Sequence, residues 1–503
     1  MKKIREYQKE AVDISASKNK GIICIPTGCG KTLIQSHTIL DHVKRSPGFG
    51  VYLVMSPRII LSYQLMRDYY EDFNRENLEF WYAGLHSGRL DSSAAEFEAL
   101  RSKDIAYQHI ISTTSSAELS EEIEKARKRG IPILIFSTYH SAERIKAATK
   151  GDPVDLIICD ESHYLVEDQF GKLLHPLEGL IYNKIFFYTA TMRFTKSESG
   201  KGMNNPAKFG EIIFQRIPRE MIELGHMVRP RMHIISFPDE QISQETLSKN
   251  AGKIVAESFL QHEYISKRAG KVLVTCTGTP MLQDILASQE IHDLRRRKGV
   301  KIYAIASNTE VNAQIDEVFV NREEFLDSLK KAGEVINQGV IILHIDILTE
   351  GIDIPGITAI LPFRSLKKSK FVQTLGRATR VAKEDLKAFE SGKYTHKELN
   401  KTVKPYAWII VPDIEGEDTL EEVSEMVTEL RAYGFNPKED VFISNERGKS
   451  PPVVLLEPTV TPTRKNQFIF EVIEEIRHEI EDEEIANLLG GKELKDYLSI
   501  VLC

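Results

Sequence analysis

The sequence lacks a long apolar run and a cysteine pair motif, and its first residues lack the apolar core of a secretory signal. No hydrophobic stretch approaches the ~18 residues that a membrane-spanning helix needs, and residues 1–8 carry charges where a signal peptide has its apolar core. The five cysteines are scattered and form no Cys-x-x-Cys, which excludes the usual zinc spacing and a disulfide framework. These absences predict free thiols, a cytoplasmic location and no membrane partner.

The net charge of −7 is unevenly distributed over the 503 residues. About 22 acidic and 9 basic residues lie from 413 onward, a balance near −13, which leaves residues 1–412 near +6. A mildly basic body permits binding of a phosphate backbone in a local groove, but charge alone does not require it. The length predicts roughly two to four domains.

A glycine-rich turn follows the first apolar run. Gly21–Ile25 predicts a buried strand, and the turn, Pro26–Thr32, reads Pro-Thr-Gly-Cys-Gly-Lys-Thr and leads into a predicted helix. Its glycines can turn backbone N–H groups toward phosphates, Lys31 can contact the β- and γ-phosphates, and the Thr32 hydroxyl can bind magnesium. The strict pattern has glycine where Ile25 stands, so the turn indicates a nucleotide site without proving it.

Two carboxylates follow another apolar run. Val154–Cys159 predicts a strand, and Asp160 and Glu161 come directly after it. Asp160 can hold magnesium through water opposite Thr32, and Glu161 can orient and deprotonate an attacking water. A strand that ends in a charged turn is the alternative if the phosphate loop is disregarded.

The first half of the chain carries weaker signals besides the glycine-rich turn and the acidic pair. The amide of Gln8 could read an adenine edge. Arg58 and Thr138 follow predicted strands and could contact phosphate, while the hydroxyls of Thr189–Thr191 could bond Asp160 or the nearby His163. Each of these residues could equally be an ordinary surface or loop residue. A further segment, roughly residues 101–129, reads as an exposed, partly helical excursion.

A second set of alternating strands and helices begins at Lys271–Cys276. Near its end a helix is predicted to carry Gln373, Arg377 and Arg380, with the two arginines one turn apart on one face. Two arginines from a second domain could stabilise the charge on a γ-phosphate. A basic surface helix is the alternative for this segment alone.

Taken in order, these signals resemble the motifs of superfamily 2 helicases and translocases over about residues 1–412. The quoted motifs are Arg5–Gln8, Pro26–Thr32, Ser56–Arg58, Ser137–Tyr139, Asp160–His163, Thr189–Thr191, Thr349–Asp353 and Gln373–Arg380. The family often has Ala or Pro before Thr-Gly-x-Gly-Lys-Thr, which explains the departure at Ile25. Asp-Glu-Ser-His and the Gln at 373 look most like the DNA-acting group, which includes restriction-enzyme motor subunits and phage or viral helicases, rather than typical DEAD-box RNA helicases.

The resemblance implies an α/β fold of two tandem RecA-like parallel-sheet domains, residues 1–232 and 233–412, that hydrolyse ATP with Mg²⁺ and act on nucleic acid. The implied catalytic residues are Lys31, Asp160, Glu161, Arg377 and Arg380, with Thr32 and Asp160 as metal ligands. The implied ATP-binding residues are Arg5, Gln8, Thr27, Gly28, Cys29, Gly30, Lys31, Thr32, Gly351, Asp353 and Gln373. The implied nucleic-acid contacts are Pro57, Arg58, Thr138, Thr275 and Thr349.

Residues 413–503 lie outside the resemblance. Apolar residues at helical spacing, such as Val423, Val427 and Leu430, predict a small, mainly helical accessory domain. One hypothesis is that this acidic domain competes with DNA or binds a protein partner, and an acidic solvated surface explains the same charge. For the whole chain the function predicted is an ATP-dependent DNA helicase or translocase, with an RNA helicase or a nucleotide-gated nucleic-acid clamp as alternatives.

Overall fold

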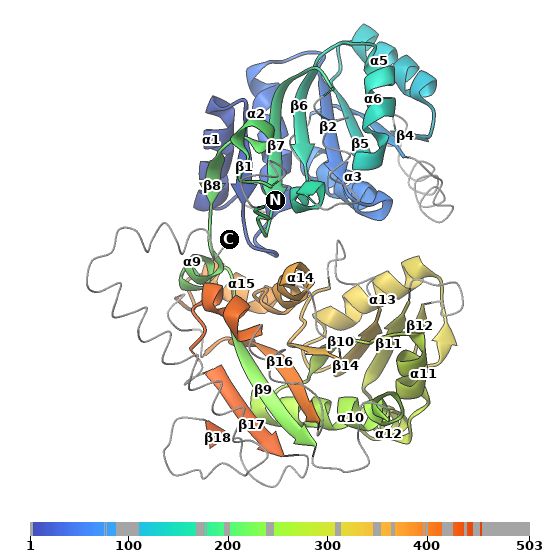
Figure 1. The fold of residues 1–503 in the computed structure, drawn as a ribbon, viewed down its shortest axis with the longest axis vertical. Helices are drawn as coiled ribbons and strands as arrows, with labels where there is room; N and C mark the ends of the chain where they lie inside the picture. The colour runs from blue at the N-terminus through green and yellow to red at the C-terminus, as the bar shows by residue number, and fades with distance from the viewer. Residues whose placement is uncertain are drawn as a thin grey trace, which may run out of the picture. The chain divides into compact units, whose positions relative to one another are not determined.

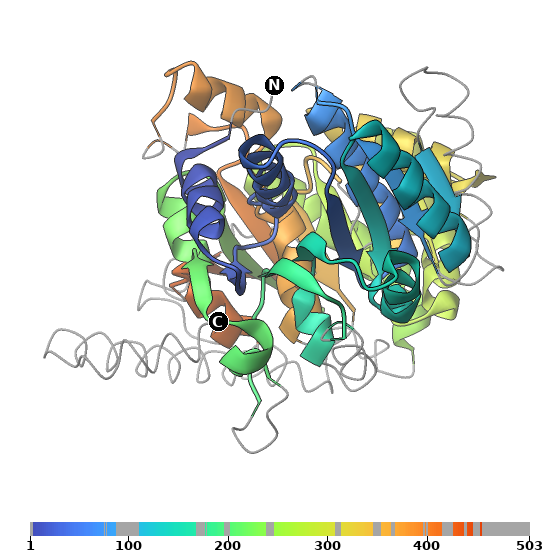
Figure 2. The same ribbon diagram turned by 90° about the horizontal axis from the view of Figure 1, so that it is seen from above.

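A computed structural model gives the fold of the protein (Figures 1 and 2). It describes residues 4–74, 76, 78–86, 110–166, 177, 179–195, 202–237, 246–306, 313–345, 354–363, 368–395, 398, 401–414, 426–436, 440–445 and 453–454. The chain divides into two compact units, Met1–Arg216 (unit 1) and Ile217–Cys503 (unit 2).

Unit 1 is built around a parallel sheet. Its described strands are β1 (Lys20–Cys24), β2 (Val51–Ser56), β3 (Trp81–Leu85), β4 (Ile110–Thr113), β5 (Ile133–Thr138), β6 (Val154–Cys159), β7 (Tyr182–Thr189) and β8 (Ile212–Gln215). They lie in the order β4-β3-β5-β2-β6-β7-β1-β8, and each described pair of neighbours is parallel. Strands β2 and β5 are buried along their whole length, which is typical of a parallel sheet covered on both faces.

Helices connect these strands and cover the sheet (Figure 1). They are α1 (Glu6–Ser17), α2 (Lys31–Arg45), α3 (Ile59–Asn74), α5 (Ser116–Arg129), α6 (Ala142–Thr149) and α8 (Pro206–Phe209), with 3₁₀ turns η2 (Tyr139–Ser141) and η3 (Ser162–Val166). Because the strands are parallel, the segments that follow β1, β2, β5 and β6 lie at one edge of the sheet, the carboxyl edge. Only β7 separates β1 from β6, so the glycine-rich turn and the acidic pair are close in space.

Unit 2 has a second, mostly parallel sheet. Its described strands are β9 (Arg229–Phe237), β10 (Lys271–Thr275), β11 (Lys301–Ile305), β12 (Gln314–Ile315), β13 (Val318–Phe319), β14 (Val340–His344), β15 (Ala359–Pro362), β16 (Tyr406–Ile414), β17 (Val441–Asn445) and β18 (Val453–Val454). The order is β13-β12-β11-β14-β10-β15-β16-β9-β17-β18. Strands β12, β13 and β18 pair antiparallel at the two ends, and the pairs from β11 to β17 are parallel.

The helices of unit 2 enclose an apolar core. They are α9 (Pro218–Glu223), α10 (Leu247–Ser266), α11 (Thr279–Ala287), α12 (Gln289–Lys298), α13 (Arg322–Glu334), α14 (Lys368–Ala378) and α15 (Lys383–Glu390), with the 3₁₀ turn η7 (Arg431–Tyr433). Alternate strand residues, such as Val272 and Val274 in β10 and Ile341 and Leu343 in β14, join apolar residues of α10, α11 and α12 in one buried cluster. Alternation places these strand residues on the same face of the sheet.

The two sheets confirm the predicted α/β fold with tandem RecA-like units. Several described strands were not predicted. Among them are Ile110–Thr113, which the sequence assigns to an exposed excursion, and Arg229–Phe237, which crosses the predicted boundary at 232 and pairs within unit 2. The described part of the predicted accessory segment adds β17 and β18 to the sheet of unit 2. A separate helical domain there stays a prediction. Among the helices that the structure describes, none combines the length and the apolarity needed to cross a bilayer.

Candidate functional site

The turn after β1 has the backbone geometry of a phosphate-binding loop. Gly28 and Gly30 have φ values of 85° and 79°, in the left-handed region that glycine enters without steric cost. Gly30 immediately precedes α2, so the turn ends at the positive end of a helix dipole. The Thr27 hydroxyl is buried and has no hydrogen-bond partner within the described part of the chain. A buried polar atom beside a helix N-terminus fits a bound nucleotide phosphate.

Helix α1 packs against this loop through two side chains. The Tyr7 hydroxyl donates a hydrogen bond of 2.6 Å to the Cys29 carbonyl, and Gln8 Nε2 donates one of 3.3 Å to the same oxygen. Gln8 Oε1 in turn accepts from the Arg5 backbone N–H at 2.9 Å. Burial raises the pKa of Tyr7 to about 12, so its hydroxyl remains a donor at neutral pH. Gln8 therefore braces the loop in this structure, and adenine contacts of Gln8 and Arg5 stay predictions.

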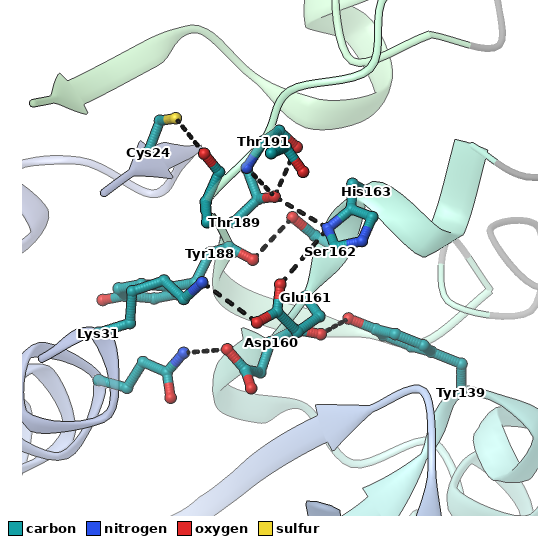
Figure 3. A network of polar contacts seen from close by, with 12 residues as sticks. Cys24, Lys31, Tyr139, Asp160, Glu161, Ser162, His163, Tyr188, Thr189 and Thr191 are labelled. Atoms are coloured by element: carbon teal, nitrogen blue, oxygen red, sulfur yellow. Dashed lines mark hydrogen bonds and ion pairs between the residues drawn. The ribbon is translucent and has the colours of Figure 1, made fainter. Parts of the chain in front are cut away.

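The two carboxylates after β6 have different surroundings (Figure 3). Glu161 Oε1 lies 3.2 Å from Lys31 Nζ, in an ion pair whose side chains are 17% and 10% exposed. Asp160 is buried, and its Oδ1 accepts a hydrogen bond of 2.7 Å from Gln35 Nε2. Glu161 has a φ of 49°, a conformation that is uncommon outside glycine and that clusters at functional sites. The fold thus brings the loop lysine together with the acidic pair.

Polar groups from other elements hold the acidic pair in place. The Tyr139 hydroxyl donates to the Asp160 carbonyl at 2.6 Å, and the Tyr69 hydroxyl donates to Gln35 Oε1 at 3.1 Å. Sequence reasoning gave none of these three residues a role. A signal for Gln35 was available, because it lies one helical turn after Lys31 and shares its face of α2. No spacing rule links Tyr69 or Tyr139 to the site, because each comes from a different element.

Burial dominates the electrostatics of the site. It raises the pKa of Asp160 to about 6, and the neighbouring charge of Glu161 acts in the same direction. Burial by itself lowers the pKa of Lys31, but the negative charges of Glu161 and Asp160 outweigh it, so the pKa is raised overall. The Lys31 ammonium therefore stays protonated and faces the two carboxylates. A divalent cation would offset the remaining negative charge.

The donor set fits magnesium bound together with a nucleotide. In the described residues no three His, Cys, Asp or Glu side chains form a metal cluster. Magnesium is usually held by one or two carboxylates together with substrate phosphates and water, rather than by a protein cage. The Asp160 carboxylate and the Thr32 hydroxyl would serve as its protein ligands.

A second network joins the acidic segment to the end of β7 (Figure 3). His163 Nδ1 lies 3.0 Å from the Thr189 hydroxyl and 3.4 Å from Glu161 Oε2. Burial lowers the pKa of His163 to about 4, so the imidazole is neutral at pH 7 and its contact with Glu161 is not an ion pair. The Thr189 hydroxyl also accepts from the Thr191 N–H at 3.1 Å. The expected link between this threonine segment and His163 is therefore present.

In unit 2 the predicted arginines lie on and after α14. Gln373 and Arg377 belong to the helix and are 4% and 3% exposed. Arg380 lies beyond the helix end and forms an isolated antiparallel bridge with Met227. The prediction that Arg377 and Arg380 share one helix face is therefore wrong, because backbone pairing with Met227 replaces the next helical turn.

The described candidates for nucleic-acid contact lie at the carboxyl ends of strands. Arg58 is exposed after β2, whereas Pro57 beside it is buried. Thr138 and Thr275 are buried, and their hydroxyls lie 3.3 and 3.1 Å from a polar side chain of their own unit. Their roles stay predictions. The further nucleic-acid candidate Thr349 and the ATP-binding candidates Gly351 and Asp353 lie outside the described residues.

Comparison with known proteins identifies the kind of fold. Residues 1–194 match the family model described as type III restriction enzyme, res subunit. The structure of the ATP-dependent type ISP restriction-modification enzyme LlaBIII bound to DNA matches with a TM-score of 0.67 and 19% identity, over 95% of this chain and 33% of that chain. Over residues 1–194 the chain thus resembles this restriction-enzyme family, and over most of its length it shares the fold of the LlaBIII structure.

Two further solved structures share the fold. A nuclease-deletion mutant of the type ISP enzyme LlaGI in complex with a DNA substrate mimic gives a TM-score of 0.59 and 17% identity, over 99% of this chain and 34% of that chain. The structure of Mss116p bound to ssRNA and AMP-PNP gives a TM-score of 0.53 and 14% identity, over 96% of this chain and 82% of that chain. The chain thus spans about a third of the length of the restriction-modification enzymes, and at these identities the likeness shows the fold alone.

Proposed function

We propose that the chain is an ATP-dependent DNA helicase or translocase. The observation that carries the proposal is the Lys31–Glu161 ion pair of 3.2 Å, which lies beside the buried Asp160 and joins the acidic pair to the glycine-rich turn. This arrangement has the groups that ATP hydrolysis needs: a cation for phosphate, a carboxylate for metal and a carboxylate for water.

Lys31 and Glu161 would exchange partners during the reaction. When ATP binds, Lys31 Nζ would turn from Glu161 to the β- and γ-phosphate oxygens. Glu161 Oε1 would then be released to orient the attacking water and accept its proton. Asp160 and Thr32 would hold magnesium, which supplies positive charge against the phosphate oxygens.

Unit 2 would complete the site with arginine. Arg377 and Arg380 are proposed to stabilise the charge that develops on the γ-phosphate, since a guanidinium is planar and permanently charged. Gly351 and Asp353 would couple nucleotide to nucleic acid, and Gln373 would contact the nucleotide. ATP would favour one arrangement of the two units and its hydrolysis products another, so the contacts with a strand would shift once per cycle.

DNA is the substrate that the motifs favour. The Asp-Glu-Ser-His sequence at 160–163 and the Gln at 373 resemble the DNA-acting group. The LlaBIII structure is bound to DNA, and the Mss116p structure, which shares the fold, is bound to ssRNA. RNA therefore remains the alternative substrate, and only a direct comparison of polymers separates the two.

The test is the ATPase rate of wild type and of Glu161→Gln, alone and with single-stranded DNA, duplex DNA, branched DNA and RNA. We expect DNA to stimulate the wild type, and Glu161→Gln to lower the rate by about 10²–10⁴-fold, as for loss of a general base, without loss of ATP binding. Glu76→Gln is the matched control, because Glu76 pairs with Lys44 at 2.7 Å elsewhere in unit 1.

The other outcomes decide between the alternatives. Stimulation by RNA alone would overturn the choice of DNA. ATP-dependent retention on nucleic acid without hydrolysis would favour a nucleotide-gated clamp.

A further inference from the structure

Unit 2 contains a cavity of about 60 Å³ whose lining includes four cationic side chains: Arg268, Lys271, Lys383 and Lys404. Lys271 is the first residue of β10, and Thr358, which also lines the cavity, immediately precedes β15. The cavity therefore lies at the amino edge of the sheet. The motif residue Thr275 lies at the other end of β10, so the cavity is not one of the sites considered above.

Two of these lysines are almost fully buried. Lys271 and Lys404 are 5% and 3% exposed. Lys271 Nζ donates to the Gly333 carbonyl at 2.5 Å, and Lys404 Nζ donates to the Arg380 carbonyl at 2.6 Å. Neither ammonium forms an ion pair within the part of unit 2 that the structure describes. Each ammonium has three N–H donors, so each retains donors that a ligand could use.

The neighbouring carboxylates, Glu334, Glu384 and Asp385, form no ion pair with Lys271 or Lys404 within the described residues. Glu334 pairs with Lys383 at the rim of the cavity. Asp385 is buried and accepts two backbone N–H groups, at 2.7 and 2.9 Å. Glu384 lines the cavity without an ion pair to any described residue. Arg268 makes one hydrogen bond, from Nε to a backbone carbonyl at 3.4 Å, and no ion pair within the described residues.

A buried ammonium without a counter-charge is unfavourable. Burial lowers the pKa of Lys404 to about 7, with the charges of Arg380 and Arg268 acting in the same direction and Asp385 against it. Burial also lowers the pKa of Lys271, against the opposing charge of Glu384. An anion in the cavity would supply both the negative charge and the hydrogen-bond acceptors that this cluster lacks.

We propose that this cavity is a binding site for a small oxyanion of phosphate size, held by Lys271, Lys404 and Arg268. The volume of about 60 Å³ compares with about 10–15 Å³ for one water molecule, so it admits such an anion but no nucleoside. Lys404 links the site to the main chain of Arg380. The inference does not depend on the proposed ATPase function.

The test uses the full chain with Lys31→Ala, so that the loop in unit 1 does not contribute phosphate binding. Inorganic phosphate and sulfate are titrated at constant ionic strength against chloride, by calorimetry and by the shift in unfolding temperature. Lys404→Met and Lys271→Met remove one ammonium each while keeping an unbranched side chain. Lys298→Met is the matched control, because Lys298 is an exposed lysine of unit 2 paired with Glu263 at 3.0 Å.

We expect one saturable phosphate site in the Lys31→Ala chain. Lys404→Met and Lys271→Met should each weaken it by about ten- to a hundredfold, since each removes hydrogen bonds to a charged group, and Lys298→Met should not. Without phosphate, Lys404→Met should unfold at the same or a higher temperature, because it removes a buried charge. Absence of saturable binding, or equal binding in both methionine variants and the control, would overturn the proposal. If one methionine variant fails to fold, phosphate binding by the other methionine variant provides the test.

Discussion

Gln35 Nε2 donates a hydrogen bond of 2.7 Å to Asp160 Oδ1, and this bond ties α2 to the turn after β6. Gln35 is fully buried, and its Oε1 accepts from the Tyr69 hydroxyl. The reverse orientation of the amide would set its oxygen against the carboxylate, so the two partners fix the side chain. The helix that begins at Lys31 thereby positions the carboxylate proposed to hold magnesium.

The first prediction concerns this bond. Gln35→Leu should lower the free energy of unfolding of unit 1 by about 1.5–3 kcal/mol, because it deprives a buried carboxylate of its donor. The chain has two tryptophans, Trp81 in β3 and Trp408 in β16. In a Trp408→Phe background, urea unfolding followed by Trp81 fluorescence reports unit 1.

A double-mutant cycle gives the control. In an Asp160→Asn chain the acceptor has no charge, so the loss caused by Gln35→Leu should be smaller, with a coupling of about 0.5–3 kcal/mol. Equal losses in the two backgrounds would show that the bond contributes nothing specific.

The second prediction concerns the contact between the loop and α1. An alanine at Gly30 would place its Cβ 2.4 Å from Gln8 Nε2, in addition to requiring a φ of 79°. We expect Gly30→Ala to destabilise unit 1 and to abolish ATP binding, measured by calorimetry.

Gly130→Ala separates the two effects of that substitution. Gly130 lies in the same unit with a φ of 69°, and a Cβ added there would meet no other atom within 4 Å, so this variant tests backbone strain alone. This strain is about 1–2 kcal/mol for a residue in the left-handed region. Gly30→Ala should lower the free energy of unfolding of unit 1 more than Gly130→Ala does, and only Gly30→Ala should abolish ATP binding. Equal effects on stability with ATP binding intact would contradict the bracing role of Gln8.

The strands that carry the site could be predicted from sequence because each is a short apolar run followed by polar or charged residues. Val154–Cys159 was predicted with the bounds that β6 has, and Asp160 and Glu161 follow it as expected. Their different environments could not be predicted, because they depend on groups from other elements, such as Tyr139.

The features that the sequence did not predict correctly also depend on groups from other elements. Ile110–Thr113 is short and polar at one end, and it is a strand because the edge of the sheet at β3 offers it backbone partners. Arg380 leaves the helical pattern because Met227, far away in the sequence, pairs with its backbone. Periodicity records local preference, and in both cases a distant partner overrides it.

The third prediction is a pH dependence in unit 2. His262 is buried, with Nε2 2.8 Å from the Thr358 hydroxyl, and burial, followed by the charges of His233 and Arg268, lowers its pKa to about 3. An unfolded histidine titrates near pH ~6.5. Between pH 6.5 and 3 the unfolded chain therefore binds a proton that the folded chain does not, so stability is fully present above this window and falls as the pH falls through it.

The size of this effect follows from the shift. At pH 5 unit 2 should be about 2 kcal/mol less stable than at pH 7 through His262 alone, at ~1.4 kcal/mol per pH unit. His262→Gln cannot titrate and should remove that part of the slope. Trp408 fluorescence in a Trp81→Phe background reports unit 2, and His140→Gln, at an exposed histidine of unit 1, is the control. An unchanged slope in His262→Gln would show that His262 is not the group responsible.

The last prediction separates binding from chemistry at the proposed ATP site. Arg377 is 3% exposed on α14, and a buried guanidinium would act on a phosphate through its fixed fork of donors. Arg377→Gln should lower polymer-stimulated ATP hydrolysis by about 10³–10⁵-fold, the range for arginine fingers, while ATP binding in unit 1 persists. Arg377→Lys should not restore the rate, because an ammonium keeps the charge but loses the bidentate geometry. Arg296→Gln, at an exposed arginine paired with Asp293 at 2.9 Å, should leave the rate unchanged. If Arg377→Gln instead lost ATP affinity and hydrolysis in parallel, the residue would contribute to ground-state binding, and the transition-state role would pass to Arg380.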